Sequence, residues 1–162
     1  MAVNHYKEHL VVFLEDEPYR DILNGAKLSL NVNLNVIDVK NPCGGWSKVF
    51  DKLEKDLALL NKFQHRNILL LIDFDDKKNI TQTSFKQRVD KFNKTVPSEY
   101  KDRVFLLGVN HKESEDLKKF FRLSNFEKIG KLLVENCPYG DLSHWNNIHL
   151  ECNLLEIERM KE

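Results

Sequence analysis

The sequence has little of what marks several broad classes of protein. Only three of its 162 residues are cysteine, and it has four prolines and six glycines. An odd and sparse set of cysteines does not form the disulfide framework of a small secreted domain, so a reducing compartment is favoured. The apolar runs are far shorter than the ~20 residues of a membrane helix, and no apolar signal core opens the chain. We therefore expect a soluble, cytoplasmic protein that makes no contact with a membrane.

The sequence also has no excess charge of one sign, because 25 Lys and Arg balance 25 Asp and Glu. Bulk electrostatics therefore does not indicate a nucleic-acid binder. A local basic group remains at Lys77 and Lys78, for which a solvated surface is the favoured explanation. Internal repeats, low-complexity segments and linkers are missing too, so residues 1–162 are expected to form a single domain.

Strand-like and helix-like segments alternate along the chain. Strands are expected near residues 9–14, 32–39, 67–73 and 104–109. Helices are expected after Pro18 with Tyr19 on the buried stripe, from Trp46, from Thr83, and near 114–122, 125–135 and 148–160. Such alternation implies βαβ units. The predicted fold is α/β: a Rossmann-like, three-layer open sheet of about four mainly parallel strands with helices on both faces. Residues 123–162 are expected to add a helical C-terminal extension.

The most informative stretch is a buried type of strand that runs into acidic residues. The apolar run 68–72 is followed by Asp73, Asp75 and Asp76. Side chains at i and i+2 of an extended chain face the same way, so Asp73 and Asp75 should project together beyond the strand's carboxyl end. Open α/β sheets place their ligands at that end. A second acidic turn, residues 15–17, follows the first strand, and the two strand ends together predict one site.

Carboxylates gathered at one sheet edge suit a hard divalent cation. Like charges a few Å apart raise one another's pKa, so several carboxylates stay ionised together only beside cations. Oxygen ligands favour Mg²⁺ or Mn²⁺, which neutralise a phosphodiester and lower the pKa of an attacking water. The expected metal ligands are Glu15, Asp73, Asp75 and Asp76. The alternative is that acids at these turns only cap helix N-termini.

Three further residues are candidates for an accessory role beside the metal. Lys77 and Lys112 could contact a phosphate, and Glu115, after the fourth strand, could bind the metal or orient a water. Each also has a plainer interpretation, since surface lysines and glutamates in the first turn of a helix are common.

The two acidic strand ends resemble the Toprim domain of topoisomerases, primases and OLD-family nucleases. The matching pieces are Val12-Phe13-Leu14-Glu15-Asp16-Glu17 and Leu71-Ile72-Asp73-Phe74-Asp75. The Gly44-Gly45-Trp46 turn and residues 108–115 look like small stand-alone proteins of the OLD-like branch, so the likeness covers about residues 8–120. The resemblance implies a metal-dependent nuclease or phosphoesterase acting on nucleic acid. Its catalytic residues would be Glu15, as ligand and general acid/base, and Asp73 and Asp75, as metal ligands.

The chain departs from the Toprim pattern in ways that affect the function. Asp16 stands where many Toprim domains have glycine. OLD nucleases also carry an ATPase domain, whereas this sequence contains no Gly-Lys-Ser/Thr phosphate loop. Either a partner protein, such as an ATPase, supplies what is missing, or the domain is a non-catalytic interaction subunit.

Two other interpretations remain open. Acids at the same two strand ends also suit a receiver-like signalling module with Asp73 as the phosphoacceptor, although no Lys-Pro pair follows the fourth strand. The second interpretation is a zinc site, because four residues near the C-terminus have suitable side chains. Their spacing fits no familiar zinc module. These residues are Cys137, His144, His149 and Cys152.

Overall fold

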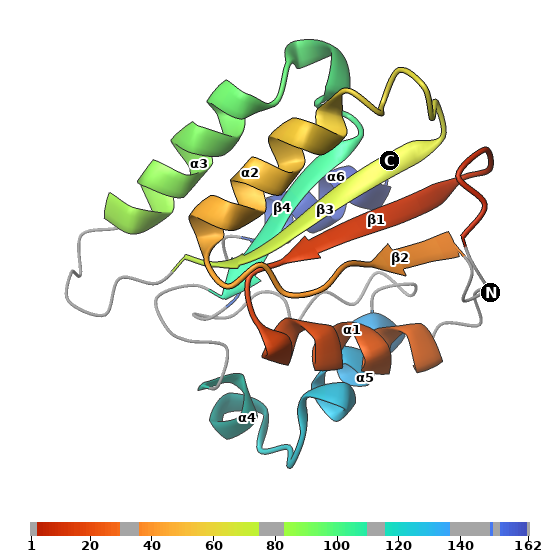
Figure 1. Ribbon diagram of the computed structural model, residues 1–162. Helices are drawn as coiled ribbons and strands as arrows, with labels where there is room; N and C mark the ends of the chain where they lie inside the picture. The colour runs from red at the N-terminus through yellow and green to blue at the C-terminus, as the bar shows by residue number, and fades with distance from the viewer. Residues whose placement is uncertain are drawn as a thin grey trace.

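The computed structural model describes residues 3–29, 36–74, 83–109, 116–136, 150 and 153–161, and they form an α/β fold around a parallel sheet (Figure 1). The strands are β1 (His9–Leu14), β2 (Ile37–Val39), β3 (Arg66–Asp73) and β4 (Val104–Val109). Their order in the sheet is β2-β1-β3-β4, and all three pairings are parallel. The predicted Rossmann-like sheet is confirmed, with its short second strand at one edge.

Helices cover both faces of the sheet, as predicted (Figure 1). One face carries α2 (Trp46–Leu57) and α3 (Thr83–Thr95). The other carries α1 (Glu17–Ser29), α4 (Asp116–Phe121), α5 (Phe126–Asn136) and α6 (Leu154–Lys161). Alternate residues of β1 and β3 enter the two cores, which explains the uninterrupted apolar runs 10–14 and 68–72 within these strands. A short 3-10 helix, η2 (Ser98–Tyr100), precedes β4.

The direction in which successive strands are added reverses between β1 and β3. The chain passes from β1 to β2 through α1 on one face, then returns through α2 on the other face to place β3 on the far side of β1. Open α/β sheets bind their ligands beyond the carboxyl ends of the strands at such a reversal. The reversal therefore marks the place where a site is expected.

Side chains from α6 and the residue before it cover the outer edge of β4. The side-chain amide of Asn153 donates to the Gly108 carbonyl at 2.5 Å and accepts from the Gly108 N–H at 2.9 Å. Glu156 Oε2 accepts from the Leu106 N–H at 3.1 Å, and Arg159 donates to the Val104 carbonyl at 2.6 Å. Four of the polar groups that this edge strand leaves open are thus paired without a further strand.

Two glycines bring the backbones of α1 and α5 close together. A Cβ atom added to Gly25 would lie 1.8 Å from the Glu127 carbonyl oxygen. A Cβ atom added to Gly130 would lie 1.7 Å from the Ile22 carbonyl oxygen. The crossing of these two helices therefore depends on the missing side chains. None of the helices in the described ranges has the length and apolar character to cross a membrane.

Candidate active site at the strand ends

The structure brings Glu15 and Asp73 into direct contact. The backbone N–H of Asp73, the last residue of β3, donates to Glu15 Oε2 at 2.7 Å. The N–H of Glu15 donates to the Leu71 carbonyl at 2.9 Å, so the pairing of the two strands continues one residue beyond β1. Both residues lie at the carboxyl ends of the strands between which the sheet order reverses. Two of the predicted site residues therefore meet at the expected place.

The other predicted site residues lie outside the described part of the chain. They are Asp75, Asp76, Lys77, Lys112 and Glu115. The four residues considered for zinc, Cys137, His144, His149 and Cys152, lie outside it as well. Within the residues that the structure describes, no group of three or more His, Cys, Asp and Glu side chains gathers as a metal site.

Tyr19 joins this site from α1, a role that its helical spacing does not reveal. Its hydroxyl donates to Asp73 Oδ1 at 2.5 Å and accepts from the Val109 N–H at 3.1 Å. Burial, and then the charge of Asp73, raise the pKa of Tyr19 well above its usual value, so the hydroxyl stays protonated. The one signal in the sequence is chemical, because a tyrosine on a buried stripe needs a partner for its hydroxyl.

Glu15 occupies a partly buried position where the charge of Arg88 acts on it. Burial raises the pKa of the Glu15 carboxyl, while the N–H of Asp73 and the charge of Arg88 act in the opposite direction. Arg88 comes from α3, is itself buried, and lies with its guanidinium carbon 4.9 Å from the centre of the Trp46 ring. A carboxyl with a raised pKa next to a specific charge is typical of groups that transfer protons or bind cations.

The turn before α2 brings the N-terminus of that helix to Glu15. The N–H of Gly44 donates to the Glu15 carbonyl at 3.0 Å, and the N–H of Cys43 donates to the Leu14 carbonyl at 2.9 Å. Gly44 has φ 83°, in the left-handed region that glycine enters without strain. The backbone of Trp46, the first residue of α2, then favours the ionised form of Glu15.

The carboxylate oxygens at this site are of the kind that binds a hard divalent cation. Mg²⁺ is usually bound through one or two carboxylates, while waters and substrate phosphates complete its shell. Glu15 and Asp73 place two carboxylates at this edge of the sheet. The Glu15 carboxylate contacts the backbone N–H of Asp73, whereas the Asp73 carboxylate, in a residue only 8% exposed, contacts Tyr19. Carboxylates withdrawn from water in this way gain most from a cation. These two residues could hold Mg²⁺ or Mn²⁺ with a phosphate ester.

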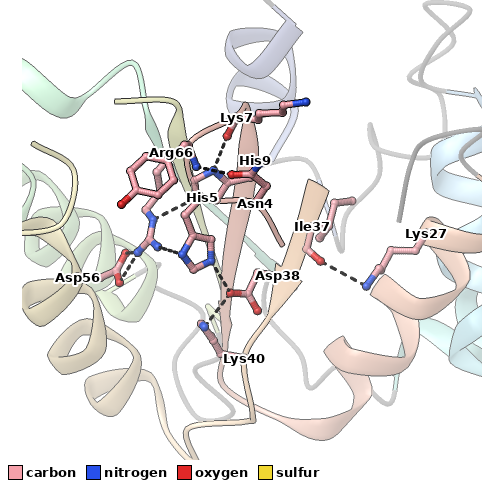
Figure 2. Close-up of polar contacts among 11 residues, drawn as sticks. Asn4, His5, Lys7, His9, Lys27, Ile37, Asp38, Lys40, Asp56 and Arg66 are labelled. Atoms are coloured by element: carbon pink, nitrogen blue, oxygen red, sulfur yellow. Dashed lines mark hydrogen bonds and ion pairs between the residues drawn. The ribbon is translucent and has the colours of Figure 1, made fainter. Parts of the chain in front are cut away.

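A second polar cluster lies at the amino ends of β1 and β3, at the opposite end of the sheet (Figure 2). Arg66 donates to both carboxylate oxygens of Asp56 at 2.8 Å, and its Nε donates to His9 Nε2 at 3.2 Å. Because Nε2 accepts this bond, His9 is neutral and its Nδ1–H donates to the Lys7 carbonyl at 2.7 Å. Arg66 and His9 are each 3% exposed. The cluster ties the N-terminal segment to the sheet.

A cavity of about 620 Å³ lies between the sheet and the helices α1, α5 and α6. Its wall is mainly aliphatic and includes Ile22, Leu71 and Leu133. An apolar wall of this kind does not suit a charged phosphate ester. The ionisable groups at the ends of β1 and β3 are therefore the better candidate for chemistry.

Comparison of the chain with protein-family models, with curated proteins and with solved structures found no match. Function must then be inferred from the site itself, since open α/β sheets host many unrelated chemistries.

Proposed function

We propose that the protein is a Mg²⁺-dependent, Toprim-like phosphoesterase or nuclease that cleaves phosphodiesters of nucleic acid. The observation that supports this function is the contact between the Glu15 carboxylate and the end of β3 at Asp73, where the strand order reverses. In this proposal Asp73 and Asp75 hold the metal, and Glu15 is both ligand and general acid/base. Because the chain has no phosphate-loop motif, an ATP-dependent step would need a partner protein.

In this proposal the bound metal and Glu15 have separate roles in hydrolysis. Bound Mg²⁺ would neutralise phosphate charge and lower the pKa of the attacking water. As the water oxygen bonds to phosphorus and the bond to the leaving oxygen breaks, Glu15 would accept the water's proton and return one to the leaving oxygen. Burial raises the pKa of the Glu15 carboxyl, which favours its taking up a proton from the attacking water.

The direct test is cleavage by the purified protein. DNA and RNA, each single- and double-stranded, should be nicked or cut with Mg²⁺ or Mn²⁺ and left intact with EDTA. We expect Glu15→Gln to lower the rate by roughly 10²–10⁴-fold, the usual share of acid–base catalysis, and Asp73→Asn, which removes a metal ligand, to abolish cleavage. The matched control is Glu17→Gln, because Glu17 is an exposed acid two residues along the chain. Equal cleavage by all four proteins would trace the activity to a contaminant.

The receiver alternative makes a different prediction for Asp73. A phosphoacceptor aspartate would take the phosphoryl group on the carboxylate oxygen other than Oδ1, which Tyr19 holds at 2.5 Å. Under the nuclease proposal a small phosphodonor should leave no acid-labile adduct on Asp73, and a labelled Asp73 would favour the receiver.

A further inference from the structure

The hydroxyl of Tyr19 stands where three elements of the fold meet. Tyr19 lies in the first turns of α1, whereas its two principal partners, Asp73 and Val109, are the last residues of β3 and β4. The side chain is 3% exposed and belongs to the same apolar cluster as Leu14 and Val109. A hydrogen bond shielded from water in this way is stronger and more directional than one at the surface.

The geometry assigns the single hydroxyl proton. The N–H of Val109 occupies one lone pair of the Tyr19 oxygen at 3.1 Å. Two acceptors remain within reach, the Ile72 carbonyl at 3.0 Å and Asp73 Oδ1 at 2.5 Å. An O–H to carboxylate bond is typically about 2.5–2.7 Å long, and such bonds are roughly twice as strong as neutral ones. The proton therefore belongs to the bond with Asp73, which fixes one oxygen of that carboxylate.

We propose that Tyr19 is a positioning residue that holds the carboxylate of Asp73 in the orientation needed to bind a divalent cation. This inference rests on the proposed function, because it assumes that Asp73 is a metal ligand. Side chains that hydrogen-bond a ligating carboxylate orient it, and their loss typically weakens metal affinity about 10–100-fold. Phenylalanine at position 19 would keep the ring in the core and remove only the hydroxyl.

The test compares Mn²⁺ binding by the wild type, Tyr19→Phe and Tyr100→Phe. Tyr100 is the matched control, since it is also buried and its hydroxyl donates to Asn61 Oδ1 at 2.5 Å, away from the strand ends. Both variants lose the hydroxyl of a buried tyrosine. Urea unfolding should show the larger loss of stability for Tyr19→Phe, because its hydroxyl bonds a carboxylate and the Val109 N–H, whereas that of Tyr100 bonds one neutral amide. Electron paramagnetic resonance should show Mn²⁺ affinity about 10–100-fold weaker for Tyr19→Phe alone. Pulsed electron paramagnetic resonance should also show additional water ligands on the bound Mn²⁺, and only in Tyr19→Phe.

Each outcome decides a different point. Equal Mn²⁺ affinity and equal hydration in all three proteins would overturn the positioning role and leave the proposed function standing. A folded wild type that binds no Mn²⁺ would overturn the metal site itself, and the role of Tyr19 with it.

A measurement on the wild type covers the case in which Tyr19→Phe does not fold. In NMR spectra of the wild type, bound paramagnetic Mn²⁺ should broaden the ring resonances of Tyr19 and leave those of Tyr100 sharp. Sharp Tyr19 resonances in the presence of bound Mn²⁺ would overturn the inference.

Discussion

Arg66 has 3% of its surface exposed, and the Asp56 carboxylate neutralises it through two contacts of 2.8 Å. Removing one partner of a buried ion pair leaves an uncompensated charge in the interior. We expect Asp56→Ala to lower the free energy of unfolding by about 3–5 kcal/mol, as measured with urea. Glu54→Ala is the control, because Glu54 is half exposed and its pair with Lys91 is 3.7 Å long. That change should cost less than about 1 kcal/mol, and equal losses would show that Arg66 does not need Asp56.

His9, in the same cluster, should make stability depend on pH. Burial lowers the pKa of His9 below its ordinary value of 6.5, and the charge of Arg66 acts in the same direction. The unfolded chain then takes up a proton at a higher pH than the folded protein does. The contribution of neutral His9 to the free energy of unfolding is therefore complete above pH 6.5 and is lost as the pH falls below that value. His9→Gln, which keeps an acceptor for Arg66, should flatten the fall in unfolding free energy between pH 8 and 5. An unchanged slope would contradict the account.

Between elements, the crossing of α1 and α5 offers a test in which two effects have opposite signs. Alanine is the better helix former by about 1 kcal/mol, so Gly130→Ala should stabilise an isolated helix. In the folded protein the new Cβ would lie 1.7 Å from the Ile22 carbonyl oxygen. The helices would have to separate, and we expect a net loss of about 1–3 kcal/mol in the free energy of unfolding. Gly45→Ala, where nothing lies within 4 Å, should be nearly neutral.

The edge of β4 is the second test between elements. Asn153 is 1% exposed and satisfies both the N–H and the carbonyl of Gly108. Asn153→Ala would leave two buried backbone groups unpaired, at about 1–3 kcal/mol for each. Unpaired strand edges also promote association, so light scattering should show larger species on warming. Leu155→Ala, at a residue 78% exposed, should change neither measurement.

The strands and helices could be predicted because their signals are local. The apolar run of β3 predicts a strand buried on both faces, and the spacing of Val49, Phe50 and Leu53 predicts the inner face of α2. The covering of β4 could not be predicted in this way. Polar residues three apart, such as Glu156 and Arg159, indicate a solvated helix face unless the strand beside them is known. From the sequence, Gly130 likewise looks only like a residue that destabilises its helix. The structure shows that it lets the Ile22 backbone approach.

For the molecule as a whole, the sequence predicts the acids of the site but not their surroundings. Glu15 and Asp73 stand out because each follows an apolar run, and a parallel sheet brings such ends to one edge. Tyr19 and Arg88 give no such signal, since each occupies an ordinary helical position. Tyr19 reaches a partner 54 residues away and another 90 residues away. Contacts of that range depend on the strand order, which local patterns do not specify.

The central claim is that Glu15 and Asp73 share a divalent cation, and a Mn²⁺ titration followed by thermal unfolding tests it most directly. A ligand that binds only the folded state stabilises it by about 2.7 kcal/mol at 100 times its dissociation constant. The midpoint should rise with Mn²⁺ for the wild type and for Glu17→Gln, and stay constant for Glu15→Gln and Asp73→Asn. A wild-type midpoint that does not respond to Mn²⁺, or the same rise in all four proteins, would contradict the account.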